Sequence, residues 1–97
     1  MADESGIRLS ALRAFLGRIH PEMRMIKAKL LADELVVSIH LDRQPTDWAR
    51  EDVSVAITEI IADFPSIRKF RHHFVVSTAP LLKEDVLEEG WIFARAE

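Results

Sequence analysis

Cysteine is absent from this chain of 97 residues, and glycine occurs only three times. Without cysteine, a disulfide framework, a thiolate zinc site and a cysteine nucleophile are all excluded. So few glycines leave no material for a loop that cradles phosphate. No segment approaches the ~20 apolar residues that a membrane-spanning helix needs. We therefore expect a globular protein whose core forms without metal or disulfide support and that does not enter a membrane.

The overall charge is slightly negative, with a formal net charge of −3 and a pI near 5.8. This balance disfavours generic binding to nucleic-acid phosphates, which lysine and arginine drive, and favours neutral or basic partners. The N-terminus, Met1–Glu4, is acidic where a secretory signal would be basic, so we expect a cytoplasmic protein. With 48% apolar and 30% charged residues, the chain predicts a single α+β domain over 1–97, in which residues 1–6 are a disordered end.

A long amphipathic helix is predicted in the middle of the chain. Thr46 is its expected N-cap, because the hydroxyl can accept from an orphan amide, and Pro65 ends it. This helix has apolar residues on two opposite faces, one broad and one narrow. A narrow stripe of Trp48, Val55 and Ala62, here called the tryptophan stripe, lies opposite the broad face. The broad face, which should meet the core, consists of Val53, Ala56, Ile57, Ile60, Ile61 and Phe64.

Two strands joined by a tight turn are predicted ahead of this helix, over Met23–Leu31 and Leu35–Asp42. The turn, Ala32–Glu34, lacks the Asn-Gly or Asp-Gly signal of the best two-residue hairpins. The second strand alternates cleanly, so one of its faces should lie on the core. The core-facing residues are Leu35, Val37, Ile39 and Leu41.

A short amphipathic helix is predicted near the N-terminus, over Arg8–Ile19, with Gly17 as its C-terminal signal. The i, i+3, i+4 spacing assigns five residues to its buried face: Leu9, Leu12, Phe15, Leu16 and Ile19.

The C-terminal third predicts two more strands, Ile67–Ser77 and Trp91–Arg95, separated by a loop at Thr78–Gly90 with a helical turn around Glu84–Glu89. The order is then α-β-β-α-β-β, which is typical of a two-layer α+β sandwich with both helices on one face of an antiparallel or mixed sheet. The long helix has the right length for a crossover between the second and third strands.

Neither a metal site nor a catalytic constellation stands out. The four histidines have no recognised ligand spacing, and adjacent His72 and His73 should face opposite sides of a strand. His40 could meet one of them across strands, but a structural histidine is the favoured interpretation. Glu59 and Asp63 lie four apart on the long helix, yet no cleft can be named for them, so a solvated flank is favoured over an acid–base pair. We expect no enzyme, no metal and no cofactor.

The third predicted strand mixes cations with aromatics. Arg68, Lys69 and Arg71 could contact RNA, as single-strand platforms do. Alternation, however, puts Phe70 and Phe74 on one side of the strand and Arg71 on the other. The aromatics should then enter the core, while the cations lie in water or mark an edge strand. RNA binding is kept as an alternative, discounted because the whole chain is acidic.

The tryptophan stripe is the favoured binding site, because its residues recur every seven positions and tryptophan is enriched in binding hot spots. The acids around it suit a protein partner with a basic patch. The predicted contact residues are Trp48, Glu51, Asp52, Val55, Glu59 and Ala62. Three alternatives stay open. The segment around Leu81, Leu82 and Leu87 could cover the stripe, Trp48 could tuck into a loop, or two copies could associate as a homodimer through this face or an uncovered strand.

Three segments resemble motifs of one bacterial family. They are A-F-L-G-R-I-H-P-E-M-R at Ala14–Arg24, T-E-I-I-A-D-F-P at Thr58–Pro65 and W-I-F-A-R at Trp91–Arg95. The chain resembles, over Leu12–Arg95, small bacterial proteins similar to the immunity proteins of contact-dependent growth inhibition systems. This resemblance implies a non-enzymatic protein that binds a cognate toxin domain and blocks it, and a basic toxin would suit the acidic chain. The sequence departs from the pattern at Ala32–Glu34, where the usual turn glycine is absent, and in its basic third strand.

Overall fold

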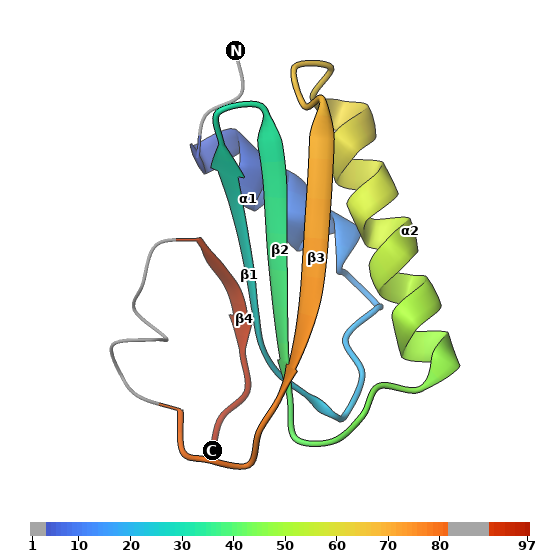
Figure 1. Ribbon diagram of the computed structural model, residues 1–97, viewed down its shortest axis with the longest axis vertical. Coiled ribbons are helices and arrows are strands. Elements are labelled where there is room, and N and C mark those ends of the chain that lie inside the picture. Colours follow the sequence, from blue (N-terminus) through green and yellow to red (C-terminus); the bar gives the residue numbers. More distant parts are fainter. Residues whose placement is uncertain (1–3, 82–89) are drawn as a thin grey trace.

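The computed structural model describes residues 4–81 and 90–97 and shows an α+β fold (Figure 1). The elements are α1 (Glu4–Ala14), β1 (Met23–Leu31), β2 (Glu34–Leu41), α2 (Asp47–Asp63), β3 (Lys69–Val76) and β4 (Trp91–Ala94). This order agrees with the predicted α-β-β-α-β-β. The predicted turn around Glu84–Glu89 lies outside the described residues. Within the described ranges, no helix has the length and apolar character needed to cross a membrane.

The strands form one mixed sheet in the order β3-β2-β1-β4. β1 is antiparallel to both β2 and β4. β3 lies parallel to β2, because the chain returns through α2 before it enters the sheet again. In Figure 1, α1 crosses behind β1 and β2, and α2 lies beside β3.

One hydrophobic core joins the sheet to both helices. The alternation of β2 predicted its inner row correctly, since Leu35, Val37, Ile39 and Leu41 are all fully buried. Most of the broad apolar face predicted for α2 is also buried, while Ile61 and Phe64 are half-buried and pack against the core. The buried residues of α2 are Ala49, Val53, Ala56, Ile57 and Ile60.

Local signals set both ends of α2. Thr46 has an extended backbone, and its Oγ1 accepts a hydrogen bond from the Ala49 amide at 3.0 Å, which confirms it as the N-cap. At the other end, Phe64 is extended and its amide donates to the Ile61 carbonyl at 3.1 Å. Pro65 follows and disfavours the helical conformation in the residue before it.

The first helix spans Glu4–Ala14 rather than the predicted Arg8–Ile19, so it both begins and ends earlier in the chain, and it buries a different face. It ends at Ala14, and Gly17 follows in a left-handed conformation with a φ of 79°. The buried residues are Ile7, Ser10, Ala11, Ala14 and, just beyond the helix, Phe15. The prediction was therefore right for Phe15 alone. The residues wrongly assigned to the core are Leu9, Leu12, Leu16 and Ile19, which are exposed. Small side chains on the observed face allow α1 to approach α2 and β1 closely.

β3 is an edge strand, as its cations indicated, and it is more exposed than predicted. Phe74 is half-buried and packs against the core, but Phe70 is 53% exposed and Val76 is 41% exposed. The prediction that the aromatics of this strand enter the core is right for Phe74 and wrong for Phe70. The reason is that β3 has a neighbouring strand on one side only, among the residues described.

Candidate functional site

Polar contacts join α1 and the connection after it to the C-terminal half of α2. Ser10, which is buried, donates from Oγ to Asp63 Oδ2 at 2.6 Å. Arg18 Nη1 donates to Glu59 Oε2 at 3.2 Å and to the Ala14 carbonyl at 2.7 Å. These contacts pair acids of α2 with residues more than forty positions earlier. These hydrogen bonds hold the C-terminal half of α2 against α1 and the connection that follows it.

The N-terminal half of α2 is held by a histidine. His20 Nε2 lies 2.7 Å from Asp52 Oδ2, with side chains only 11% and 20% exposed. The same imidazole meets the Trp48 ring edge-on, with centroids 5.2 Å apart and planes at 88°. The His20 amide is fixed in turn against Met23 Sδ at 3.4 Å. His20 therefore orients Trp48 on the surface of α2.

The tryptophan stripe faces solvent. Trp48 is 71% exposed and Val55 is 38% exposed, and Ala62 is exposed as well. The alternative in which Trp48 tucks into a loop is therefore wrong. Of the segment suggested to cover the stripe, Leu82 and Leu87 lie outside the described residues.

The acids predicted around the stripe differ in their surroundings. Glu51 is exposed, as a contact residue would be. Asp52 and Glu59 are held by His20 and Arg18, so part of their charge is balanced within the chain. The structure therefore brings the predicted residues together on one side of α2. The negative potential there is weaker than three acids would give, because Arg18 and His20 pair with two of them.

Two apolar residues that sequence reasoning placed in the core lie on the surface near this site. Leu16 is 81% exposed and Ile19 is 42% exposed. They lie on either side of Gly17 and Arg18, in the connection from which Arg18 contacts Glu59 of α2. Gly17 was the available signal: a helix that ends before it cannot place Leu16 and Ile19 on one helical face.

The cations proposed for RNA binding do not form a platform with the aromatics. In the register of β3 against β2, Arg71 lies beside Val36 and Phe70 beside Leu35, so they occupy opposite faces of the sheet. Arg71 also pairs with Glu34 at 3.4 Å. Arg68 and Lys69 are exposed at the start of the strand. This geometry gives no support to an RNA site.

No group of three or more metal-ligating side chains converges in the described parts of the chain. His72 and His73 occupy opposite faces of β3, as alternation predicted, and His73 Nε2 lies 2.9 Å from Ser38 Oγ. The carboxylates of Glu59 and Asp63 are bound to Arg18 and Ser10 rather than directed into a cleft.

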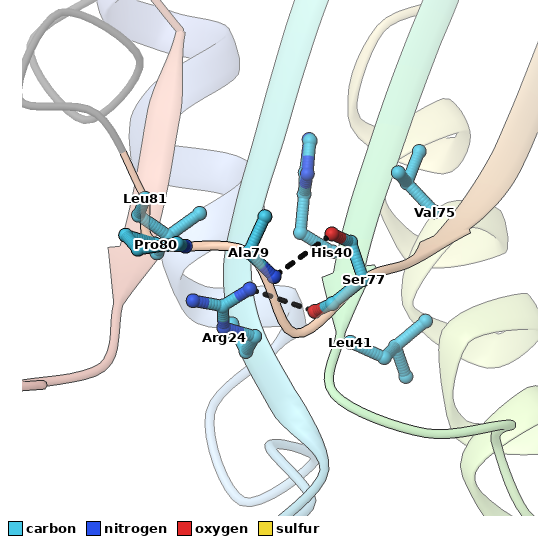
Figure 2. Close-up of a pocket in the computed structure, with 8 residues that line it drawn as sticks. All are labelled: Arg24, His40, Leu41, Val75, Ser77, Ala79, Pro80 and Leu81. Carbon is cyan, nitrogen blue, oxygen red and sulfur yellow. Dashed lines mark hydrogen bonds between the residues drawn. The ribbon is translucent and has the colours of Figure 1, made fainter.

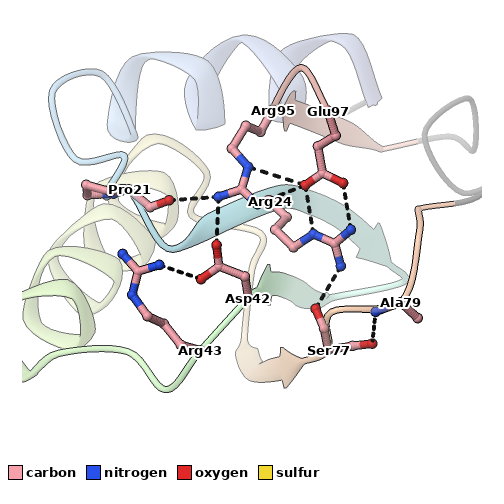
Figure 3. Close-up of polar contacts among 8 residues, drawn as sticks. All are labelled: Pro21, Arg24, Asp42, Arg43, Ser77, Ala79, Arg95 and Glu97. Carbon is pink, nitrogen blue, oxygen red and sulfur yellow. Dashed lines mark hydrogen bonds and ion pairs between the residues drawn. The ribbon is translucent and has the colours of Figure 1, made fainter.

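A charged network secures the C-terminal residues (Figure 3). Arg24 is buried and binds Glu97 through two nitrogens, at 2.8 and 2.6 Å, and donates to the Ser77 carbonyl at 2.7 Å. Arg95 joins Glu97 at 3.0 Å and Asp42 at 2.9 Å. The hydrogen bond from Arg24 is the main reason that the pKa of Glu97 falls to about 2. We interpret this network as structural, because its charges are satisfied by one another.

Two hollows lie away from the tryptophan stripe. One, of about 240 Å³, lies between the end of β3 and β1, where Arg24, Ser77 and Pro80 line it (Figure 2). The guanidinium of Arg24 is already engaged by Glu97 and Ser77, so it is not available to a ligand. The other, of about 300 Å³, lies between Lys27 and His73 on the sheet face that carries Ser38. Neither is larger than the smallest typical ligand pockets.

These observations define a class: a small α+β protein that presents an exposed tryptophan on a helix fixed by polar contacts. Such a surface is typical of protein-binding modules. The chain belongs to the MafI2 immunity protein family, which it matches over residues 4–97. A search of curated proteins found no match.

The family match confirms one part of the resemblance noted in the sequence. It confirms the class of immunity proteins, whose members are generally non-enzymatic and bind a toxin protein. It does not support contact-dependent growth inhibition, because Maf is a different toxin system.

Proposed function

We propose that this protein neutralises a cognate toxin domain by binding it directly through the tryptophan stripe and its surroundings. The contact surface consists of Trp48, Glu51, Asp52, Val55, Glu59 and Ala62, extended by Leu16 and Ile19. The observation that carries this proposal is the 71% exposure of Trp48 in a chain of the MafI2 immunity protein family. Tryptophan is among the residues most enriched in the hot spots that dominate binding energies.

We infer that α1 and α2 cover the same face of the sheet as one layer. Their buried residues join a single core with the inner row of β2. The outer side of this layer then combines the α2 surface with the exposed leucines of α1, Leu9 and Leu12. Because His20 and Arg18 already hold the Asp52 and Glu59 side chains, these two acids lose little conformational entropy on binding.

The partner surface should be basic around an apolar centre. Glu51 and Asp47 are exposed on α2, and the net charge of the chain is −3. Complementary charge accelerates encounter and rejects wrong partners, while the apolar centre supplies most of the affinity. An acidic immunity protein can in this way select one toxin among related ones.

The test compares two exposed aromatics. Affinity for a purified cognate toxin domain is measured by calorimetry for the wild type, Trp48→Ala and Phe70→Ala. We expect Trp48→Ala to weaken binding by about 30-fold or more, the scale of a hot-spot residue, while the melting temperature falls only slightly because the edge contact with His20 is lost. Phe70, 53% exposed on β3, is the matched control and should leave affinity unchanged. Unchanged binding by Trp48→Ala would refute the proposed surface.

A further inference from the structure

The outer edge of β3 has unused backbone groups. The Ser77 amide donates to the Leu41 carbonyl at 2.9 Å, and the Lys69 amide to the Asp33 carbonyl at 3.4 Å. Alternate residues of a strand direct their backbone N–H and C=O groups to the same side. The backbone groups of the odd-numbered residues of β3 therefore point toward β2. No other strand pairs with β3 in the part of the chain that the structure describes. The residues whose backbone groups face away from the sheet are Phe70, His72, Phe74 and Val76.

This edge strand carries protective charge only in its first half, at Lys69 and Arg71, and it also exposes apolar side chains. Phe70, Val75 and Val76 are 53%, 38% and 41% exposed. Proteins commonly block such strands with charge, proline or a bulge. The register of β3 against β2 runs without a bulge over all eight residues, from Glu34 beside Lys69 to Leu41 beside Val76. A regular strand of this kind is a template for another strand.

The distribution of charge along β3 favours a second copy in antiparallel orientation. The cations, Lys69 and Arg71, lie in the first half of the strand, and the apolar residues Val75 and Val76 lie at its end. A two-fold axis at His73 places Arg71 opposite Val75 of the second copy and Phe70 opposite Val76. No lysine or arginine then faces its own counterpart, whereas a parallel arrangement would place like charges together. We propose that two copies of this protein associate through β3 in this register and form one continuous sheet.

This interface and the tryptophan stripe lie on different sides of α2. The Arg50 guanidinium covers the Phe74 ring at 5.1 Å from its centroid, so the side of α2 that carries Arg50 faces β3. Arg50 follows Trp48 by two positions, which is roughly 200° around a helix. A dimer through β3 therefore leaves Trp48 exposed for a toxin, and the two proposals stand or fall separately.

The test compares two exposed valines on the full chain. Sedimentation equilibrium at micromolar concentration should give twice the monomer mass of 11.1 kDa for the wild type. Val76→Lys places a cation opposite Phe70 of the second copy and should weaken dimerisation by about tenfold or more. Val55, similarly exposed at 38% but on the tryptophan stripe, is the control. Val55→Lys should leave the dimer intact and weaken only toxin binding.

A backbone variant gives a second, independent measurement. His72→Pro removes an amide that faces away from the sheet, so the pairing with β2 survives while the pairing between copies loses hydrogen bonds. We expect a folded monomer by circular dichroism and sedimentation, and His72→Ala should remain dimeric. A wild-type protein that sediments as a monomer at hundreds of micromolar would overturn the proposal. So would a Val76→Lys dimer as tight as the wild type, since the interface would then lie elsewhere.

Discussion

His20 Nε2 lies 2.7 Å from Asp52 Oδ2, across a separation of 32 positions in the chain. This contact joins the connection between α1 and β1 to the first half of α2. It also brings the imidazole edge against Trp48, the most exposed aromatic described. One side chain thus links the stability of the helix pair to the orientation of the candidate binding residue.

Replacing His20 should affect both properties. His20→Ala removes a partly buried hydrogen bond to a carboxylate, so we expect a loss of about 1–2 kcal/mol in the free energy of unfolding. His20→Gln can still donate to Asp52 and should lose less. Urea denaturation of the two variants measures the difference. Equal losses would mean that the hydrogen bond contributes nothing and that only the packing of the ring matters.

Acid should destabilise the protein through Glu97. Its pKa falls from the ordinary 4.5 to about 2 in the folded chain, chiefly because Arg24 donates to its carboxylate. The unfolded chain then binds a proton at a higher pH than the folded chain. The contribution of ionised Glu97 to the free energy of unfolding is fully present above pH 4.5 and is lost as the pH falls toward 2. Melting temperatures of the wild type should decline across this window.

Glu97→Gln is the control for that pH dependence. The variant should melt lower than the wild type at pH 7, because the charge-assisted bonds to Arg24 and Arg95 are weakened. Its melting temperature should fall less steeply between pH 4.5 and 2. Parallel profiles for the two proteins would place the acid sensitivity in other carboxylates, such as Asp42, whose pKa is lowered by Arg95.

The hairpin turn stores strain at Ala32. This residue has a φ of 57°, in the left-handed region that glycine adopts without cost. Ala32→Gly should therefore raise stability by about 0.5–1 kcal/mol, or a few degrees in melting temperature. Ala32→Val, with a branched side chain, should lower it. A drop in stability for Ala32→Gly would show that the entropy of the unfolded chain dominates here.

Gly90 should tolerate no side chain. It has a φ of 91°, and a Cβ would lie 2.7 Å from Lys29 Cγ and 3.0 Å from the Ala28 carbonyl oxygen. Gly90→Ala should therefore cost about 2 kcal/mol or more, because backbone strain and steric overlap add. Gly17 is the matched control, because it has a φ of 79° and a Cβ there would meet nothing within 4 Å. Gly17→Ala should cost only about 1 kcal/mol, and equal losses would exclude the overlap.

Several elements could be predicted because their signals are local. The cap at Thr46 and the stop before Pro65 depend on neighbouring residues only, and both ends of α2 follow from them. The alternation of β2 predicted its buried row for the same reason. The candidate site was predicted in part: the exposed stripe with Trp48 and Val55 follows from helical periodicity.

The contacts that shape the site could not be predicted in this way. Nothing in the sequence relates His20 to Asp52 or Ser10 to Asp63, because such pairs form only when distant elements pack. The buried face of α1 was misjudged for a related reason. Leu9 and Leu12 lie on one face of the helix, and Ala11 and Ala14 lie on another. Because leucine is more hydrophobic than alanine, the prediction assigned the leucine face to the core, whereas the structure exposes it.

By itself, the sequence determined the class of fold, the order of its elements, the ends of α2 and the residues that form the tryptophan stripe, since each depends on spacing along one segment. Tertiary structure decided which face of α1 is buried, which acids of α2 are balanced by Arg18 and His20, and that β3 ends the sheet among the residues described. Those outcomes depend on the free energy of packing between segments, and periodicity within one segment contains no information about its neighbour.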